Sequence, residues 1–235
     1  MSSNRPMARP LAPRRRPPRR RRLASSIFLL ALVAVLVGVG LEVDHRVDDG
    51  PALSPMRSRI VQIAQSQLGY RTDPSDSYCN RYSAYWDAGT DDCGNSNLDE
   101  EWCADFAAWV WKQAGAEVEY QLAPGYLNSD SASFYVWGLN HHTWHPIGTP
   151  YTPQPGDVAI YGLDTSTVTA DHVAIVTAAT THQDAPDVIN GDGDRTGFSV
   201  VETGSKQVYA DTKGGSGSKI SGYVSPEAPS GSSGS

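Results

Sequence analysis

The sequence contains no internal repeat, and it lacks the motifs that bind nucleotides, flavins or haem. We therefore expect no organic cofactor. It also lacks the composition of a collagen-like or disordered chain, because 39% of its 235 residues are hydrophobic and 19% are charged. That share of apolar residues is enough for one ordinary hydrophobic core. We expect a monomer.

Acidic residues are absent from the first 22 positions, which hold nine of the 19 lysines and arginines. The remainder of the chain then has 10 basic residues against 26 acidic ones, a formal net charge of −16. Phosphate backbones repel an acidic body of this kind, so we expect no nucleic-acid partner.

Charged residues are also missing from the stretch 23–41. As a helix this stretch would extend roughly 28 Å, close to the thickness of a bilayer's hydrocarbon layer. The Arg/Pro-rich segment 1–22 should remain in the cytoplasm, while the acidic body crosses the membrane. We predict a membrane anchor or a signal segment over 23–41, with a linker over 42–53. The protein is then secreted or membrane-anchored, with Gly38 and Gly40 as a weak cleavage signal.

The cysteines are Cys79, Cys93 and Cys103, an odd number that leaves one sulfur without a partner in the chain. Cys79 and Cys93 flank a polar stretch, and cross-linking a loop of that size stabilises a fold by roughly 3 kcal/mol. We therefore expect a disulfide between Cys79 and Cys93 and a free Cys103. Pairing of Cys93 with Cys103 is the alternative.

Hydrophobic spacing predicts two helices followed by short strands. The first helix should begin at Pro55, with Ser54 as its N-cap, and end near Gly69. The second should run from about Trp102 to Ala114, and the polar stretches before and after it are expected to be loops. Period-two patterns predict strands over 157–161, 172–177, 187–190, 198–202 and 220–224.

Helices that precede strands favour an α+β fold, in which the helices pack on one side of a mostly antiparallel sheet. The Ser/Gly-rich residues 226–235 are expected to form a disordered tail.

Cys103 is the candidate nucleophile, because the unpaired N–H groups at the start of a helix favour a thiolate. The acidic residues 99–101 precede it and would raise the pKa of the thiol. His172, at the start of a predicted strand, is the candidate general base. A hairpin centred near Thr181 would place Asn190 opposite His172, where the amide can accept the ring N–H.

Three segments, taken in order, resemble the CHAP family of cysteine- and histidine-dependent amidohydrolase/peptidase domains, which are common in secreted bacterial and phage wall enzymes. They are 101–111 (EWCADFAAWVW), 155–161 (PGDVAIY) and 172–176 (HVAIV). The likeness extends over about 54–225, which we take as the catalytic domain.

The resemblance implies a papain-like α+β fold, cleavage of amide bonds in peptidoglycan, Cys103 as nucleophile and His172 as base. The third position of the family is commonly a glutamate, with an asparagine two residues further on. This chain has Asn190 and Asp192 there, so Asp192 is the alternative residue for orienting the ring. Trp86, Trp102 and Tyr161 are candidate residues of the substrate groove.

The expected reaction is acyl transfer through a thioester on Cys103, with peptidoglycan as the partner. The alternative is a non-catalytic wall-binding or scaffolding module that kept the fold and lost the reaction. Asp171 fits that alternative, because the family commonly has glycine before the histidine.

A metal site is the remaining alternative, suggested by His141, His142 and His145. Their spacing is not that of a zinc hydrolase. The segment 190–201 begins like an EF-hand loop, but Arg195 stands where the sharp-turn glycine belongs. We expect no catalytic metal, and a structural calcium ion in the acidic loop at Asp91 and Asp92 stays an open alternative that we do not predict.

Overall fold

The computed structural model describes residues 53–178, 186–193, 199–204 and 219–229. The arginine-rich segment, the predicted span at 23–41, most of the linker and the last six residues of the predicted tail lie outside these ranges. Within the described ranges, no helix is both long and apolar enough to cross a bilayer.

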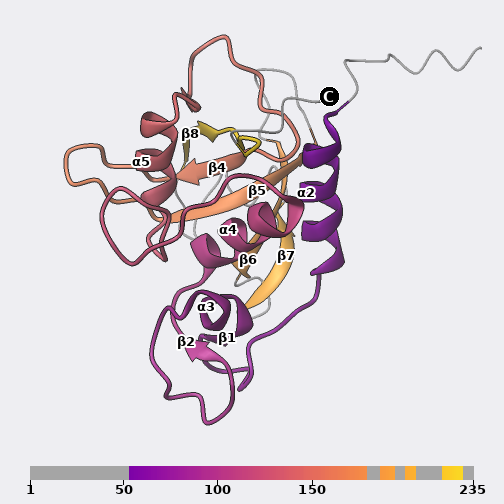
Figure 1. The fold of residues 1–235 in the computed structure, drawn as a ribbon, viewed down its shortest axis with the longest axis vertical. Coiled ribbons are helices and arrows are strands. Elements are labelled where there is room, and N and C mark those ends of the chain that lie inside the picture. The colour runs from indigo at the N-terminus through magenta and orange to yellow at the C-terminus, as the bar shows by residue number, and fades with distance from the viewer. Residues whose placement is uncertain (1–52, 179–185, 194–198, 205–218, 230–235) are drawn as a thin grey trace, which may run out of the picture. The chain divides into compact units, whose positions relative to one another are not determined.

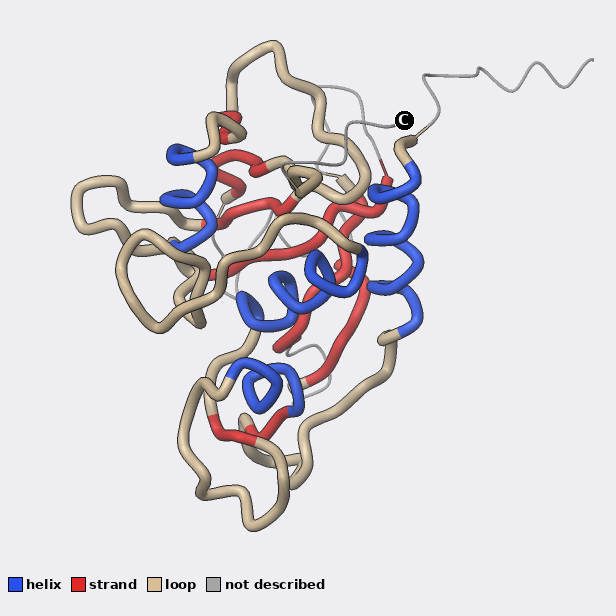
Figure 2. Tube along the Cα trace, in the orientation of Figure 1, coloured by secondary structure: helices blue, strands red, loops and turns tan. Residues whose placement is uncertain are grey.

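Helices dominate the first half of the described chain and strands the second half (Figures 1 and 2). In chain order the elements are α2 (Pro55–Ser66), β1 (Cys79–Asn80), α3 (Arg81–Trp86), β2 (Leu98–Asp99), α4 (Cys103–Ala114), α5 (Ser133–Asn140), β3 (Trp144–Pro146), β4 (Val158–Tyr161), β5 (His172–Ala178), β6 (Asp187–Gly193), β7 (Val200–Gly204) and β8 (Ile220–Val224).

The two predicted helices are present, with the expected boundary signals. Helix α2 begins at Pro55, and the Oγ of Ser54 accepts the N–H of Arg57. Helix α4 begins at Cys103 and ends at Ala114, and its C-cap is Gly115, which has a φ of 85°. A residue with a side chain is strained at that angle, so glycine ends the helix there at little cost.

Helices α3 and α5 lie in stretches that we predicted to be loops. Helix α3 is six residues long and depends on the side chain of Asn80, which accepts the N–H groups of Tyr82 and Ser83. Helix α5 has no side-chain cap and is held by its buried residues Phe134 and Trp137. Neither helix has the long amphipathic pattern that marks a helix in a sequence.

Six strands form an antiparallel sheet in the order β3-β8-β4-β5-β6-β7. One buried cluster joins the apolar residues of α2, α4 and α5 to those of one face of this sheet. A smaller buried cluster lies on the opposite face of the sheet and includes Ala159, Ala174 and Val188. The predicted α+β architecture, with helices packed on one side of a mostly antiparallel sheet, is confirmed.

The predicted register between β5 and β6 is wrong by two residues. Ile175 lies opposite Ile189 and Val176 opposite Val188, so the hairpin does not place Asn190 directly across from His172. A shift of two residues keeps a side chain on the same face of a sheet. Asn190 therefore still shares a face with His172.

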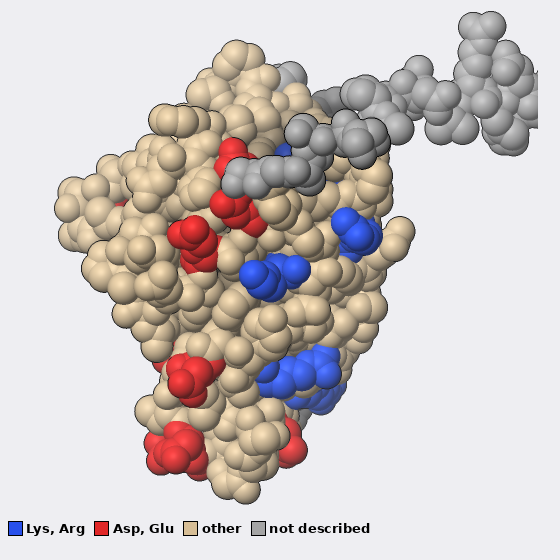
Figure 3. All heavy atoms as spheres, in the orientation of Figure 1, with Lys and Arg blue, Asp and Glu red and all other residues tan. Residues whose placement is uncertain are grey.

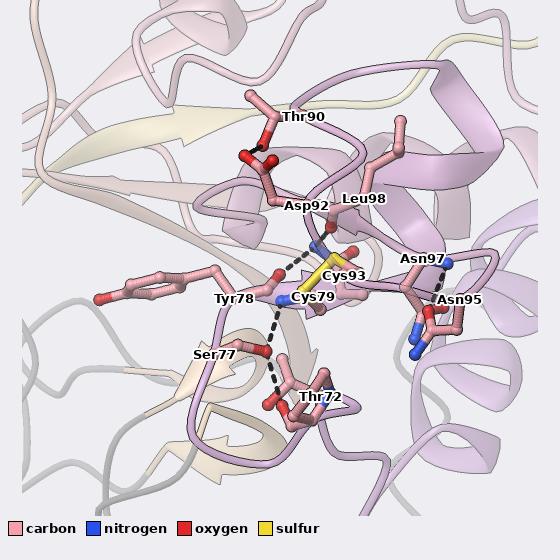
Figure 4. Close-up of a disulfide and its surroundings, with 12 residues drawn as sticks. Thr72, Ser77, Tyr78, Cys79, Thr90, Asp92, Cys93, Asn95, Asn97 and Leu98 are labelled. Atoms are coloured by element: carbon pink, nitrogen blue, oxygen red, sulfur yellow. Dashed lines mark hydrogen bonds between the residues drawn. A yellow bond between two sulfur atoms is a disulfide. The ribbon is translucent and has the colours of Figure 1, made fainter.

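The disulfide between Cys79 and Cys93 is confirmed, and it closes the loop that precedes α4 (Figure 4). Strand β1, which contains Cys79, pairs with β2 next to the start of α4. The pairing leaves Cys103 as a free, buried cysteine.

Charges on the face drawn in Figure 3 are scattered. The lysine and arginine side chains form separate patches, mostly on the side where α2 lies, and they do not form one continuous basic surface.

Candidate active site

Cys103 is held in the core at the start of α4. Its side chain is 6% exposed, and its Sγ lies 3.2 Å from the Oγ of Ser131. The sulfur also accepts a hydrogen bond from the backbone N–H of Val173, the residue that follows His172. The thiol is therefore beside the first residues of β5.

The backbone of β5 explains this position of the sulfur. The backbone N–H of Val176 donates to the carbonyl of Asp157, on the side of β5 that faces β4. Successive backbone N–H groups of a strand point to alternate sides, so the N–H of Val173 points toward β6. The pairs between β5 and β6 begin only at Ile175. The sulfur of Cys103 thus lies beside a residue of β5 that is not paired with β6.

His172 and Asn190 are brought together on this part of the sheet. Asn190 is buried, its amide donates to the carbonyl of Glu202 at 3.3 Å, and its side chain bonds the ring of His172. The bond to Asn190 raises the pKa of His172, as expected when the ring N–H donates and an amide oxygen accepts. A side-chain contact of this kind can hold the imidazole in one orientation.

Asp192, the alternative to Asn190, has other partners. Its carboxylate accepts the backbone N–H of Trp102 at 3.3 Å and the hydroxyl of Ser199 at 2.5 Å. Asp192 thus ties the residue before Cys103 to the strand side of the site.

Burial holds both candidate catalytic groups in their neutral forms. Burial is the largest of the causes that raise the pKa of the Cys103 thiol to about 12, and the charges of Asp192 and Asp105 contribute to the same rise. The acidic residues 99–101, which we expected to raise this pKa, are not among the causes of the rise. Burial also lowers the pKa of His172 to about 4. At neutral pH the resting site therefore contains a thiol and an uncharged imidazole that can act as a base.

Two of the three residues predicted to line a substrate groove are buried in the core. Trp102 and Tyr161 are 0% and 1% exposed and belong to the core. The indole of Trp102 stacks on Tyr82 and donates to Ser199, which accounts for its burial. Trp86 is half-buried and stacks on Tyr120 with ring centroids 4.2 Å apart.

The histidines considered for a metal are used in other contacts. His141 lies 2.8 Å from a carboxylate oxygen of Glu227, and His145 stacks on Tyr151. Among the residues that the structure describes, no group of three histidine, cysteine or acidic residues is arranged to hold a metal ion.

Two polar residues near Cys103 were not singled out in the sequence. Ser131 lies 28 residues away in a loop, and no local signal points to it. Asp105 is fully buried among apolar residues of α4, which is an unusual place for a carboxylate. Its carboxylate oxygens accept hydrogen bonds from the hydroxyls of Ser83 and Tyr120. Asp105 therefore links α4 to α3 and to the loop that contains Tyr120.

Asp105 should make the stability of the fold depend on pH. Burial raises the pKa of its carboxyl from 3.8 to about 6, so the folded state holds the proton over a range where the unfolded chain has lost it. The free energy of unfolding should fall by about 3 kcal/mol as the pH rises from about 4 to above 6. Asp105→Asn should remove this fall, measured by urea unfolding at pH 4, 6 and 8. Parallel profiles of wild type and variant would contradict the assignment.

The site combines a free cysteine at the start of a buried helix with a histidine at the start of a neighbouring strand, and this histidine is bonded to an asparagine. Cysteine-dependent hydrolases have this arrangement. Residues 94–191 match the family model of the CHAP domain. The chain therefore contains a CHAP domain. Members of this domain family are generally cysteine- and histidine-dependent amidohydrolases or peptidases. The match includes Cys103, His172 and Asn190 and ends one residue before Asp192.

No curated protein matches the chain. A search of solved structures found NlpC1 from Trichomonas vaginalis, with 11% sequence identity and a TM-score of 0.41. That match covers 75% of this chain and 46% of the other, so the chain spans less than half the length of NlpC1.

Proposed function

We propose that this protein is a hydrolase that cuts amide bonds in peptidoglycan, with Cys103 as its nucleophile. The observation that carries the proposal is the hydrogen bond from the backbone of Val173 to the sulfur of Cys103, because it sets the thiol beside the strand that begins with His172. The match to the CHAP domain over the same residues supports it.

In the proposed reaction, His172 takes the proton of the Cys103 thiol while the sulfur attacks the carbonyl carbon of the amide. The C–N bond then breaks as the imidazolium gives that proton to the departing amine, which leaves a thioester on Cys103. Water attacks the thioester with His172 as base, releasing a carboxylic acid and restoring the thiol. Asn190 holds the imidazole in one orientation throughout.

The developing oxyanion needs hydrogen-bond donors close to the sulfur. The backbone N–H of Cys103, at the start of α4, is one donor. The hydroxyl of Ser131, 3.2 Å from the sulfur, is the second donor that we assign.

The burial of Cys103 favours one alternative, a non-catalytic module that binds the wall. A thiol that is 6% exposed and has a pKa of about 12 is a poor nucleophile unless a base activates it. The two functions differ in the reactivity of the thiol and in the dependence of that reactivity on His172.

The reaction should take place outside the cytoplasm. This follows from the charge pattern around 23–41, which predicts that the acidic body crosses the membrane. Peptidoglycan is the partner in that compartment.

The proposed function predicts soluble fragments when the full-length protein is incubated with purified peptidoglycan. Mass spectrometry should find one water added at an amide bond, with a new amine and a new carboxyl group. Alkylation with iodoacetamide should stop the release, and a metal chelator should not. Fragments cut at glycosidic bonds, or activity lost in chelator and kept after alkylation of Cys103, would contradict the proposal.

A further inference from the structure

A ring of hydrogen bonds and short chain segments begins at α4 and returns to it. Asp105 stands two residues after Cys103, and its Oδ1 accepts the hydroxyl of Tyr120. The hydroxyl of Tyr120 also receives a hydrogen bond from the side chain of Ser129. Ser131, two residues further along the chain, contacts the sulfur of Cys103 at 3.2 Å. The ring therefore connects the proposed nucleophile to the hydroxyl that we assign as the second oxyanion donor.

The side chain of Tyr120 is held at its ring as well as at its hydroxyl. Trp86 of α3 stacks on the ring, with the centroids 4.2 Å and the planes 10° apart. The indole N–H of Trp86 donates to the backbone carbonyl of Asp105 at 3.1 Å. The carboxylate of Asp105 is 0% exposed, so water cannot replace the hydroxyls that donate to it. Tyr120 therefore has a fixed position relative to α4.

Backbone hydrogen bonds connect this position to the loop that contains Ser131. The residues on both sides of Tyr120 pair with Leu127. The N–H of Leu127 donates to the carbonyl of Glu119 at 3.1 Å, and the N–H of Gln121 donates to the carbonyl of Leu127 at 3.0 Å. The segment that leads to Ser131 is thus tied to the Tyr120 region by its backbone and by a side chain.

We propose that Tyr120 is a positioning residue of the hydrolysis. Its hydroxyl, held by Asp105, fixes Ser129 and thereby places the hydroxyl of Ser131 where the oxyanion forms. The inference deepens the proposed function and rests on it for the reaction. A donor that is already in place needs no reorganisation when negative charge develops on the oxygen, so the position of Ser131 should determine part of the rate.

The test compares the full-length wild type with Tyr120→Phe on solubilised peptidoglycan. The variant keeps the ring that stacks on Trp86 and loses only the hydroxyl between Asp105 and Ser129. We expect kcat to fall roughly tenfold at an unchanged KM, because an oxyanion donor acts in the transition state. Tyr85→Phe changes a tyrosine of α3 that is 50% exposed, and it should keep the wild-type values.

A double variant separates positioning from general damage to the fold. Ser131→Ala should lower kcat roughly 100-fold, the usual loss for one oxyanion donor. If Tyr120 acts through Ser131, adding Tyr120→Phe to Ser131→Ala should lower kcat no further. Alkylation of Cys103 by iodoacetamide forms no oxyanion, so its rate should be equal in wild type and Tyr120→Phe. Losses of kcat that multiply in the double variant, or a changed alkylation rate, would overturn the assignment.

Hydrogen exchange tests the positioning without the reaction. In Tyr120→Phe the amides of the segment 127–131 should exchange roughly tenfold faster than in wild type, while those of β4 should not change. Ser129→Ala removes the same contact from the other side and should give the same results, which covers the case that Tyr120→Phe does not fold. Unchanged exchange in these variants would overturn the assignment. Faster exchange, when the wild type releases no wall fragments, would refute the hydrolase proposal and not the link between Tyr120 and the Ser131 loop.

Discussion

Replacing Cys103 with alanine should lower the release of wall fragments by roughly 1,000-fold or more, because the variant has no atom that can form the thioester. The fold should change little. The sulfur is small, and its loss removes the hydrogen bonds to Ser131 and Val173 at a cost of about 1 kcal/mol. Fragment release is measured by mass spectrometry, and the midpoint of thermal unfolding should fall by about 2–4 °C.

Two variants serve as controls for this result. Cys103→Ser keeps a hydroxyl that can bond to Ser131, and it should be as inactive as the alanine variant with a smaller change in stability. Lys112→Ala changes an exposed residue of the same helix and should retain wild-type activity. Wall fragments released by Cys103→Ala at close to the wild-type rate would refute the role of Cys103.

Replacing His172 with alanine should slow hydrolysis by about 100- to 10,000-fold, the usual contribution of a general base. It should also slow alkylation of Cys103 at neutral pH. With a pKa of about 12 the thiol forms almost no thiolate by itself, whereas the imidazole, with its pKa lowered to about 4, is uncharged and can accept the proton. Iodoacetamide labelling, followed by mass spectrometry of the Cys103 peptide, measures the rate.

The pH profile of this labelling distinguishes an enzyme from a wall-binding module. In His172→Ala the rate should rise roughly tenfold for each pH unit between 6 and 9, as for any thiol below its pKa. The wild type should react faster at pH 7 and follow a flatter profile. His142→Ala, an exposed histidine outside the site, is the matched control and should behave as wild type. Identical profiles in wild type and His172→Ala would favour the non-catalytic module.

The site residues that we predicted wrongly from the sequence are those whose position depends on contacts between residues far apart in the chain. The groove residues Trp102 and Tyr161 are aromatic side chains whose burial depends on neighbours far along the chain, such as Ser199 for Trp102. Asn190 meets His172, but through a register two residues away from the predicted one. Alternation along a strand is local, whereas the pairing of two strands depends on the turn and on the packing around it.

The sequence by itself determined the helix ends at Ser54 and Gly115 and the alternating strands, because each follows from the conformational preference of a few adjacent residues. It also indicated a free Cys103, because the number of cysteines is odd. Only the tertiary structure decided that the sulfur of Cys103 lies beside the backbone of Val173 and beside Ser131. Those contacts join residues 28 or more positions apart, and packing of the whole core selects them.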